Sequence, residues 1–289
     1  MKKKILLVGL DSRLGKVFYN QYNKRFNIYG TSRNKIKRKN IYYLNLKNIQ
    51  NFNFNLHFDY VIILSGVVDY KDCQKNYRTA KLINCVNIPK LILNFLENNS
   101  RIIFVSSNTV FKYKNNLPSE YSKTNPGFNY AKLKDISEKK ILSYKKRFNN
   151  KISIVRISKN IDISKYPFDY WIKNIKKKKS ILALNDLYFA PILYENSAFL
   201  LKKIIDKNYS GVFHLSGVED ITYAEFAKKF LLFIGIKKNL VKPVSSKDLN
   251  IKLTYNHPVT ALRMNRTTRY TGIKPVDLKR IFNYLYKFI

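Results

Sequence analysis

The chain has 289 residues, of which 45% are hydrophobic and 15% aromatic. A chain of this length buries roughly three quarters of its unfolded surface, so it needs no disulfide or metal to hold a core. This composition excludes a disordered chain. The only cysteines are Cys73 and Cys85, and the three histidines are isolated from one another. A zinc cluster of the usual spacing is therefore excluded, and we expect no metal site.

The net charge is +37, because 55 Lys and Arg residues oppose 18 Asp and Glu residues. Such a charge attracts nucleic acid, an anionic membrane or an anionic substrate. Codon bias is the alternative explanation, because the chain is also rich in Asn, Ile, Tyr and Phe, the amino acids of A/T-rich codons. The basic residues are scattered over the whole length, which fits bias better than a binding patch. We therefore do not expect nucleic acid as a partner, and the origin of the charge stays open.

The apolar run at residues 5–10 follows three lysines but stops at Asp11, which is too early for a signal peptide. No stretch approaches the roughly 18 apolar residues of a membrane span. We expect a cytoplasmic protein with no membrane partner.

Short β-like runs alternate with helical patterns through the N-terminal half, which indicates parallel βαβ units. Apolar residues from Leu14 onward fall on one helix face, and Pro126 fits the first turn of a later helix. Strands are expected at 5–8, 28–30, 41–44, 60–64, 101–106 and 152–156, and helices at 14–22, about 75–98 and about 126–146. The pattern predicts an α/β fold with a doubly wound parallel sheet, whose ligands lie beyond the carboxyl ends of the strands.

The pattern of expected helices and strands changes after about residue 160. Helices are expected at about 194–205, 223–234 and 278–289, with a strand at 212–215. No linker rich in Pro, Gly or Ser separates the two parts. We therefore expect a sheet domain over residues 1–160 and a smaller α/β lobe over 161–289, with an approximate boundary and interleaved segments.

The turn after the first strand has glycines at positions 9 and 15. A pyrophosphate needs such a sharp turn, close backbone approach and free N–H groups at a helix start. Ser12 takes the middle position of the G-x-x-G-x-x-G pattern, and a plain strand-to-helix turn is the alternative. The candidate cofactor-binding residues are Gly9, Asp11, Ser12, Arg13, Leu14 and Gly15.

The end of the second strand decides between NAD and NADP. NAD sites usually place an Asp or Glu there to hold the ribose 2′-OH. Here Thr31-Ser32-Arg33 takes that position, and the Arg33 guanidinium suits a 2′-phosphate. The sequence therefore predicts NADP(H), although in so basic a chain an arginine there can also arise by chance.

Ser107 ends the fifth strand, and Tyr130 and Lys134 share one face of the helix that follows. A phenol with an ordinary pKa of about 10 is a poor acid–base catalyst near neutral pH. An adjacent ammonium is expected to lower that pKa, and a hydroxyl from the strand is expected to polarise a carbonyl. Among 22 tyrosines such a Tyr–Lys pair is common by chance, but its place one helix after Ser107 favours a catalytic set.

Three features resemble those of extended short-chain dehydrogenases/reductases: the turn at Gly9–Gly15, Ser106-Ser107 at the end of the fifth strand, and Tyr130-x-x-x-Lys134. Longer stretches resemble one branch of that family, the dTDP-4-dehydrorhamnose reductase-like, sugar-nucleotide-binding proteins, in the right order over nearly the whole chain. The stretches are Val105–Phe111, Asn125–Tyr130 followed by Lys134 and Glu138, Ile154–Arg156, Gly211–Gly217, and Arg263–Pro275.

The resemblance implies a Rossmann-type domain that binds NADP(H) and a lobe that binds substrate. It implies that Tyr130 is the general acid that protonates a carbonyl oxygen, and that Ser107 hydrogen-bonds the same oxygen. It implies that Lys134 lowers the pKa of Tyr130 and holds the nicotinamide ribose. Further cofactor-binding positions implied in this way are Leu64, Ser65, Gly66 and Asn84.

The function implied by the resemblance is NADP(H)-dependent reduction of a nucleotide-linked 4-keto (deoxy)sugar. The alternatives are a sugar-nucleotide epimerase or dehydratase of the same superfamily and a non-catalytic NADP-binding regulatory homologue. The chain departs from the branch at Ser12, Asn45, Asn108 and Thr109, so the sugar, the nucleotide base and the use of a divalent metal stay open. A homodimer also stays open.

Overall fold

The computed structural model describes residues 2–36, 38–49, 52, 56–112 and 115–289. The chain forms two compact units, each assembled from segments that are separated in the sequence. Unit 1 comprises Met1–Phe111, Lys123–Arg156 and Ser197–Phe213, and unit 2 comprises Lys112–Ser122, Ile157–Asn196 and His214–Ile289.

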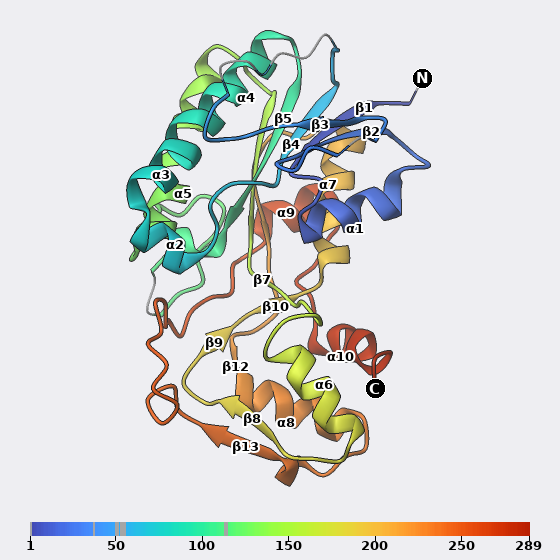
Figure 1. The fold of residues 1–289 in the computed structure, drawn as a ribbon, viewed down its shortest axis with the longest axis vertical. Helices are drawn as coiled ribbons and strands as arrows, with labels where there is room; N and C mark the ends of the chain where they lie inside the picture. Colours follow the sequence, from blue (N-terminus) through green and yellow to red (C-terminus); the bar gives the residue numbers. More distant parts are fainter. Residues whose placement is uncertain (1, 37, 50–51, 53–55, 113–114) are drawn as a thin grey trace. The chain divides into compact units, whose positions relative to one another are not determined.

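A seven-stranded sheet with the order β11-β6-β5-β4-β1-β2-β3 runs through unit 1 (Figure 1). The pairs β1–β2, β1–β4, β2–β3 and β4–β5 are parallel. The strand order reverses between β1 and β4, and doubly wound sheets bind ligands at the carboxyl ends of the strands on either side of such a point. The strands are β1 (Lys4–Val8), β2 (Asn27–Ser32), β3 (Ile41–Tyr43), β4 (Tyr60–Ile63), β5 (Arg101–Ser107), β6 (Ile152–Ile157) and β11 (Gly211–Leu215).

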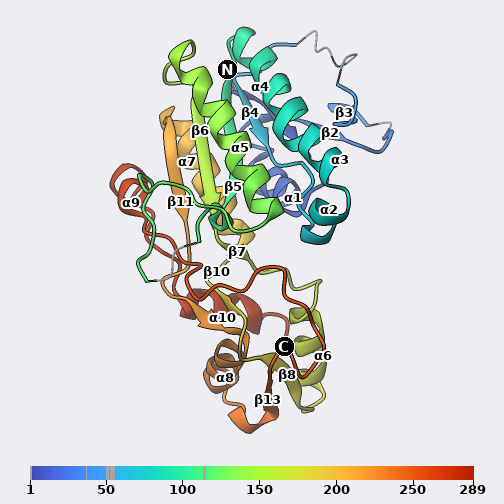
Figure 2. The ribbon, with the colours of Figure 1, turned by 90° about the vertical axis from the view of Figure 1, so that its left-hand side faces the viewer.

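Helices cover both faces of this sheet (Figures 1 and 2). On one face lie α4 (Ile88–Glu97) and α5 (Asn129–Ser143), and on the other lie α1 (Arg13–Tyr22) and α7 (Tyr194–Lys207). Strands covered on both sides read as continuous apolar runs, which is why the four residues at positions 5–8 of β1 are all fully buried. The predicted doubly wound α/β fold is confirmed by this arrangement.

The predicted helix at 75–98 is a series of shorter pieces. They are α2 (Tyr70–Lys75), α3 (Tyr77–Lys81), a π-helical turn (Leu82–Asn87) and α4. The carboxylate of Asp69 accepts hydrogen bonds from the N–H groups of Lys71 and Asp72 at 2.8 and 3.0 Å, so α2 begins earlier than apolar periodicity indicates. The predicted helical stretch is confirmed, since α3, the π-helical turn and α4 follow one another without a gap, and α2 adds a separate helical turn before it.

The helix that carries Tyr130 begins at Asn129, so the predicted place of Pro126 in its first turn is wrong. The Asn125 N–H donates to the Val110 carbonyl oxygen at 3.0 Å, which keeps the chain tied to the segment after β5 at this point. Phe128 is extended, with a φ of −149°, and the helix starts only after it.

Unit 2 has an aromatic core. Phe168 and Trp171 of α6 (Phe168–Lys176) have ring centroids 5.4 Å apart, and Phe226 of α8 (Tyr223–Phe233) lies 5.2 Å from Phe282 of α10 (Leu278–Tyr286). The sequence predicted α8 and α10 but missed α6, the helix at Asn265–Thr271 and the short strands. The remaining elements of unit 2 are β7 (Lys159–Asn160), β8 (Ile181–Leu184), β9 (Tyr188–Phe189), β10 (Pro191–Ile192), β12 (Ile221–Thr222), β13 (Val241–Val244) and α9 (Asn265–Thr271).

Across the part of the chain that the structure describes, none of the helices has both the length and the apolar character needed to cross a bilayer.

Candidate active site

The turn between β1 and α1 is closely packed around its glycines. Gly9 has a φ of +97°, which glycine adopts at little cost, and a Cβ there would lie 2.7 Å from the Cβ of Ser65. A Cβ on Gly15 would lie 2.7 Å from two backbone carbonyl oxygens of the same turn. Ser12 takes the place of a glycine and caps α1, because its Oγ accepts from the Gly15 N–H at 3.1 Å. Arg13 and Leu14 open the helix, the first exposed and the second buried.

The end of β2 is tied to this turn. The Gly9 N–H donates to Thr31 Oγ1 at 3.1 Å, and Ser32 Oγ donates to the Asp11 carboxylate at 3.1 Å. The Asp11 carboxylate therefore lies at the end of β2, although β2 itself contains no acidic residue. Arg33 follows directly, with an exposed side chain. Sequence reasoning missed this role of Asp11 because the acid comes from the neighbouring turn and not from β2 itself.

The segment after β4 runs beside the same turn. The Leu64 N–H donates to the Val8 carbonyl oxygen at 2.9 Å, and the Ser65 hydroxyl is buried with no hydrogen-bond partner among the described residues. Gly66 has a φ of +152°, and a Cβ there would lie 2.7 Å from Asn84 Oδ1. The Asn84 amide holds the next residue, because it accepts from the Val67 N–H and donates to the Val67 carbonyl, each at 2.9 Å. Asn84 lies in the π-helical turn, a feature often found at functional sites.

Ser107, Tyr130 and Lys134 come together where β5 meets α5. The Ser107 and Tyr130 side chains share a hydrogen bond. Lys134 Nζ donates to the carbonyl oxygen of Val105 at 2.9 Å, two residues before Ser107, and lies 4.6 Å from the centre of the Phe104 ring. All three side chains predicted to be catalytic are at least nine-tenths buried.

The pKa of Tyr130 is raised far above that of an ordinary phenol. Burial is the largest cause, and the nearby Tyr70 raises the pKa further, while the hydrogen bond with Ser107 lowers it. The ring centroids of Tyr70 and Tyr130 are 5.1 Å apart. The expected lowering of this pKa by Lys134 is not found, because the ammonium group is directed to the Val105 carbonyl and burial of the phenol dominates.

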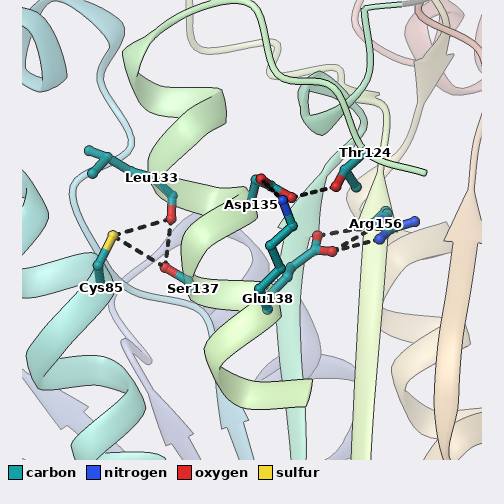
Figure 3. A network of polar contacts seen from close by, with 8 residues as sticks. Cys85, Thr124, Leu133, Asp135, Ser137, Glu138 and Arg156 are labelled. Carbon is teal, nitrogen blue, oxygen red and sulfur yellow. Dashed lines mark hydrogen bonds and ion pairs between the residues drawn. The ribbon is translucent and has the colours of Figure 1, made fainter. Parts of the chain in front are cut away.

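Burial lowers the pKa of Lys134 to about 8, and the Glu138 carboxylate one helical turn away opposes that effect. Glu138 is paired with Arg156 of β6 through hydrogen bonds of 2.7 to 3.2 Å, and both side chains are buried (Figure 3). The Arg156 guanidinium also lies 4.9 Å from the centre of the Phe111 ring. Arg156 provides the hydrogen bonds that the buried Glu138 carboxylate needs, and the pair holds α5 against β6. The negative charge of Glu138 also acts on Lys134 and raises the pKa of that lysine.

The same helix is anchored on its other side. Ser137 Oγ lies 2.7 Å from the Asn84 carbonyl oxygen and 2.8 Å from that of Leu133, beside the Cys85 thiol (Figure 3). Asp135 accepts hydrogen bonds from Thr124 and Lys139. The contacts of Ser137 with Asn84 and of Asp135 with Thr124 hold α5 against the π-helical turn and against the segment that precedes α5.

Sequence reasoning missed two further residues of this region. Tyr70 contacts Tyr130, and its only sequence signal is the Asp69 cap that starts α2. The Thr109 hydroxyl donates a hydrogen bond to Ser107 Oγ at 3.0 Å, and the only sequence signal for Thr109 is its departure from the family pattern. Within the described ranges, no group of three or more His, Cys, Asp or Glu side chains is placed to hold a metal ion.

A profile of the RmlD substrate binding domain family matches residues 2–284. The chain belongs to this family. A search of curated proteins finds no match to it.

Solved structures share the fold of this RmlD-family chain at low identity. The dTDP-4-dehydrorhamnose reductase of Yersinia enterocolitica is 18% identical, with a TM-score of 0.81 over 100% of both chains. The dTDP-4-dehydrorhamnose reductase of Bacillus anthracis, in complex with NADP, is 18% identical, with a TM-score of 0.80 over 99% of both chains. A dTDP-glucose 4,6-dehydratase of Bacillus anthracis, in complex with NAD, is 15% identical, with a TM-score of 0.74 over 99% of this chain and 97% of the other. The predicted Rossmann-type fold is confirmed by these likenesses.

Proposed function

We propose that this chain is an NADP(H)-dependent reductase of a nucleotide-linked 4-keto (deoxy)sugar. The observation that carries the proposal is the buried hydrogen bond between Ser107 and Tyr130, with Lys134 one turn further along α5, in a member of the RmlD substrate binding domain family. A phenol and an alcohol that converge in a buried place can act on one carbonyl oxygen.

The residues of unit 1 fit NADP(H). The Ser65 hydroxyl is buried without a partner in the described chain and lies beside Gly9, so a polar ligand group at this turn would satisfy it. The exposed Arg33 guanidinium at the end of β2 suits a 2′-phosphate. The Bacillus anthracis reductase of the same fold is in complex with NADP. The residues that would hold the cofactor are Gly9, Asp11, Ser12, Arg13, Leu14, Gly15, Arg33, Leu64, Ser65, Gly66, Asn84, Tyr130 and Lys134.

Bound NADPH supplies a hydride to the carbonyl carbon of the substrate. Tyr130 donates its proton to the carbonyl oxygen, and its raised pKa keeps the phenol protonated until negative charge develops on that oxygen. Ser107 donates a hydrogen bond to the same oxygen from a fixed position, so little reorganisation is needed as charge develops. The Ser107 hydrogen bond supports the phenolate that remains, because it lowers the pKa of Tyr130, and solvent returns the proton. Lys134, which is directed to the Val105 carbonyl, would hold the nicotinamide ribose.

The test is a panel of nucleotide-linked 4-keto sugars offered to the purified chain with NADPH, followed by NADPH absorbance and by analysis of the product. We expect one member of the panel to deplete NADPH and to yield the alcohol in equal amount. Binding of NADPH without turnover of any member would overturn the reductase and favour a non-catalytic homologue.

A dehydratase or epimerase is the second candidate, because a dehydratase in complex with NAD shares this fold over 97% of its length. Such an enzyme recycles its cofactor, so it would convert a nucleotide sugar with no net change in NADPH. Product analysis of reactions with no added reduced cofactor separates the two candidates. The cytoplasmic location, the homodimer and the lack of nucleic-acid binding stay predictions.

A further inference from the structure

A single 3₁₀ turn, Asn108–Val110, follows β5, and Ser107 is its N-cap. Ser107 Oγ accepts two hydrogen bonds from one residue, the Thr109 N–H at 3.2 Å and the Thr109 hydroxyl at 3.0 Å. Its one proton faces two acceptors, Asn108 Oδ1 at the longer distance of 3.3 Å and the Tyr130 oxygen, with which Ser107 shares the hydrogen bond described above. Thr109 is only 3% exposed, so water does not compete for these bonds.

These contacts limit what Ser107 can do. A serine hydroxyl has two lone pairs and one proton. Thr109 occupies both lone pairs, once through its N–H and once through its hydroxyl. The proton is then the only group that Ser107 can offer to a neighbour, and it is divided between Asn108 Oδ1 and the Tyr130 oxygen.

We propose that Thr109 is a positioning residue that makes Ser107 a hydrogen-bond donor only, aimed at the reacting oxygen. This inference rests on the reductase function proposed above. In that reaction the Ser107 proton turns from Asn108 Oδ1 and the Tyr130 oxygen to the carbonyl oxygen of the substrate. Ser107 cannot accept the Tyr130 proton, which therefore goes to the carbonyl oxygen, and no covalent bond to Ser107 forms or breaks.

The first experiment separates this role from simple packing. Thr109→Val keeps the branched shape and the N–H but removes the hydroxyl, so one lone pair of Ser107 becomes free. We expect kcat to fall about tenfold, the size of one neutral hydrogen bond, with the KM for the keto sugar and the NADPH affinity nearly unchanged. Thr109→Ser, which keeps the hydroxyl, should restore the rate.

A double-mutant cycle sharpens the result. In a Ser107→Ala background, Thr109→Val should cost nothing further, because the group that it positions is gone. A loss of rate that is the same with and without Ser107, or a Thr109→Ser variant as slow as Thr109→Val, would overturn the proposal and leave Thr109 with a packing role.

The second experiment does not need a substrate, so it tests whether Thr109 makes Ser107 a donor only, separately from the reductase function. A fluorinated tyrosine, which is more acidic than tyrosine, is placed at position 130 and titrated by fluorine NMR. In the Thr109→Val variant Ser107 is free to accept from the phenol, which stabilises the protonated form. The titration should then shift upward by about 0.5 to 1 pH unit, while Thr109→Ser should match the parent. Identical titrations in Thr109→Val and the parent would overturn the proposal.

Discussion

The two ends of the candidate site use their polar groups in opposite ways. Where β5 meets α5, Ser107, Tyr130 and Lys134 are buried, and each is held by a defined partner. Where the end of β2 meets the turn between β1 and α1, Asp11 and Arg33 are exposed to solvent. Water and salt screen charges at the second end and not at the first. Single substitutions should therefore cost orders of magnitude at the buried end and much smaller factors at the exposed end.

The largest effect is expected for Tyr130→Phe, which removes only a hydroxyl from the buried end. General acid catalysis is typically worth about 10²–10⁴ in rate, so turnover of the panel substrate should fall by about that factor while NADPH binding persists. Steady-state kinetics and cofactor titration measure the two quantities. Tyr286→Phe, at an exposed position, is the matched control and should behave as the parent. A Tyr130→Phe variant as fast as the parent would show that another group donates the proton.

Lys134 gives the next effect, on stability as a function of pH. Its pKa in the folded chain is about 8, below the ordinary 10.5, so the folded chain loses this proton first as pH rises. The cost of burying the ammonium is fully present below about pH 8 and is relieved between the two values. The parent should therefore gain about 3 kcal/mol of unfolding free energy relative to Lys134→Met across that window.

Urea unfolding of the parent and of Lys134→Met at several pH values measures this difference, in which the titrations of the other groups largely cancel. Lys132→Met changes an exposed lysine on the same helix and should show no such dependence on pH. A difference between parent and Lys134→Met that stays constant from pH 7 to 10.5 would contradict the lowered pKa.

The same contrast explains what could be predicted from the sequence. The strands of the sheet are apolar runs and the turn at Gly9 and Gly15 is local, so both can be recognised along the chain. Tyr130 and Lys134 are four residues apart on one helix, so their shared face follows from spacing alone.

Long-range contacts account for what could not be predicted. The pKa of Tyr130 depends on Tyr70, which lies on another helix, and on the depth of burial. The acid at the end of β2 comes from Asp11 through a hydrogen bond to Ser32, and the two residues are 21 positions apart. Spacing along the chain carries no signal for such contacts, because they depend on how closely elements pack.

At the exposed end, Arg33→Ala should remove most of a preference for NADPH over NADH. A charge-assisted hydrogen bond to a 2′-phosphate is worth about 1.5–3 kcal/mol, which corresponds to roughly a ten- to hundredfold preference. Dissociation constants of both cofactors for the parent and the variant provide the measurement. Arg280→Ala removes the same charge at another exposed position and controls for the net charge of the chain. Equal affinities of the parent for both cofactors would contradict the assignment of Arg33.

The smallest effect is expected for Asp11→Asn. The Asp11 carboxylate accepts from Ser32 directly before Arg33, so it places a negative charge close to where a 2′-phosphate would bind. The amide keeps an oxygen that can accept the same hydrogen bond but removes the charge. Because the side chain is exposed, the repulsion is worth about 0.2–1 kcal/mol, and the NADPH preference should rise by only about two- to fivefold. The gain should shrink as salt is added, since exposed charges are screened. If Asp11→Asn instead weakens NADPH and leaves NADH unchanged, Asp11 supports the 2′-phosphate site through Ser32, and the charge itself is not what the cofactor senses.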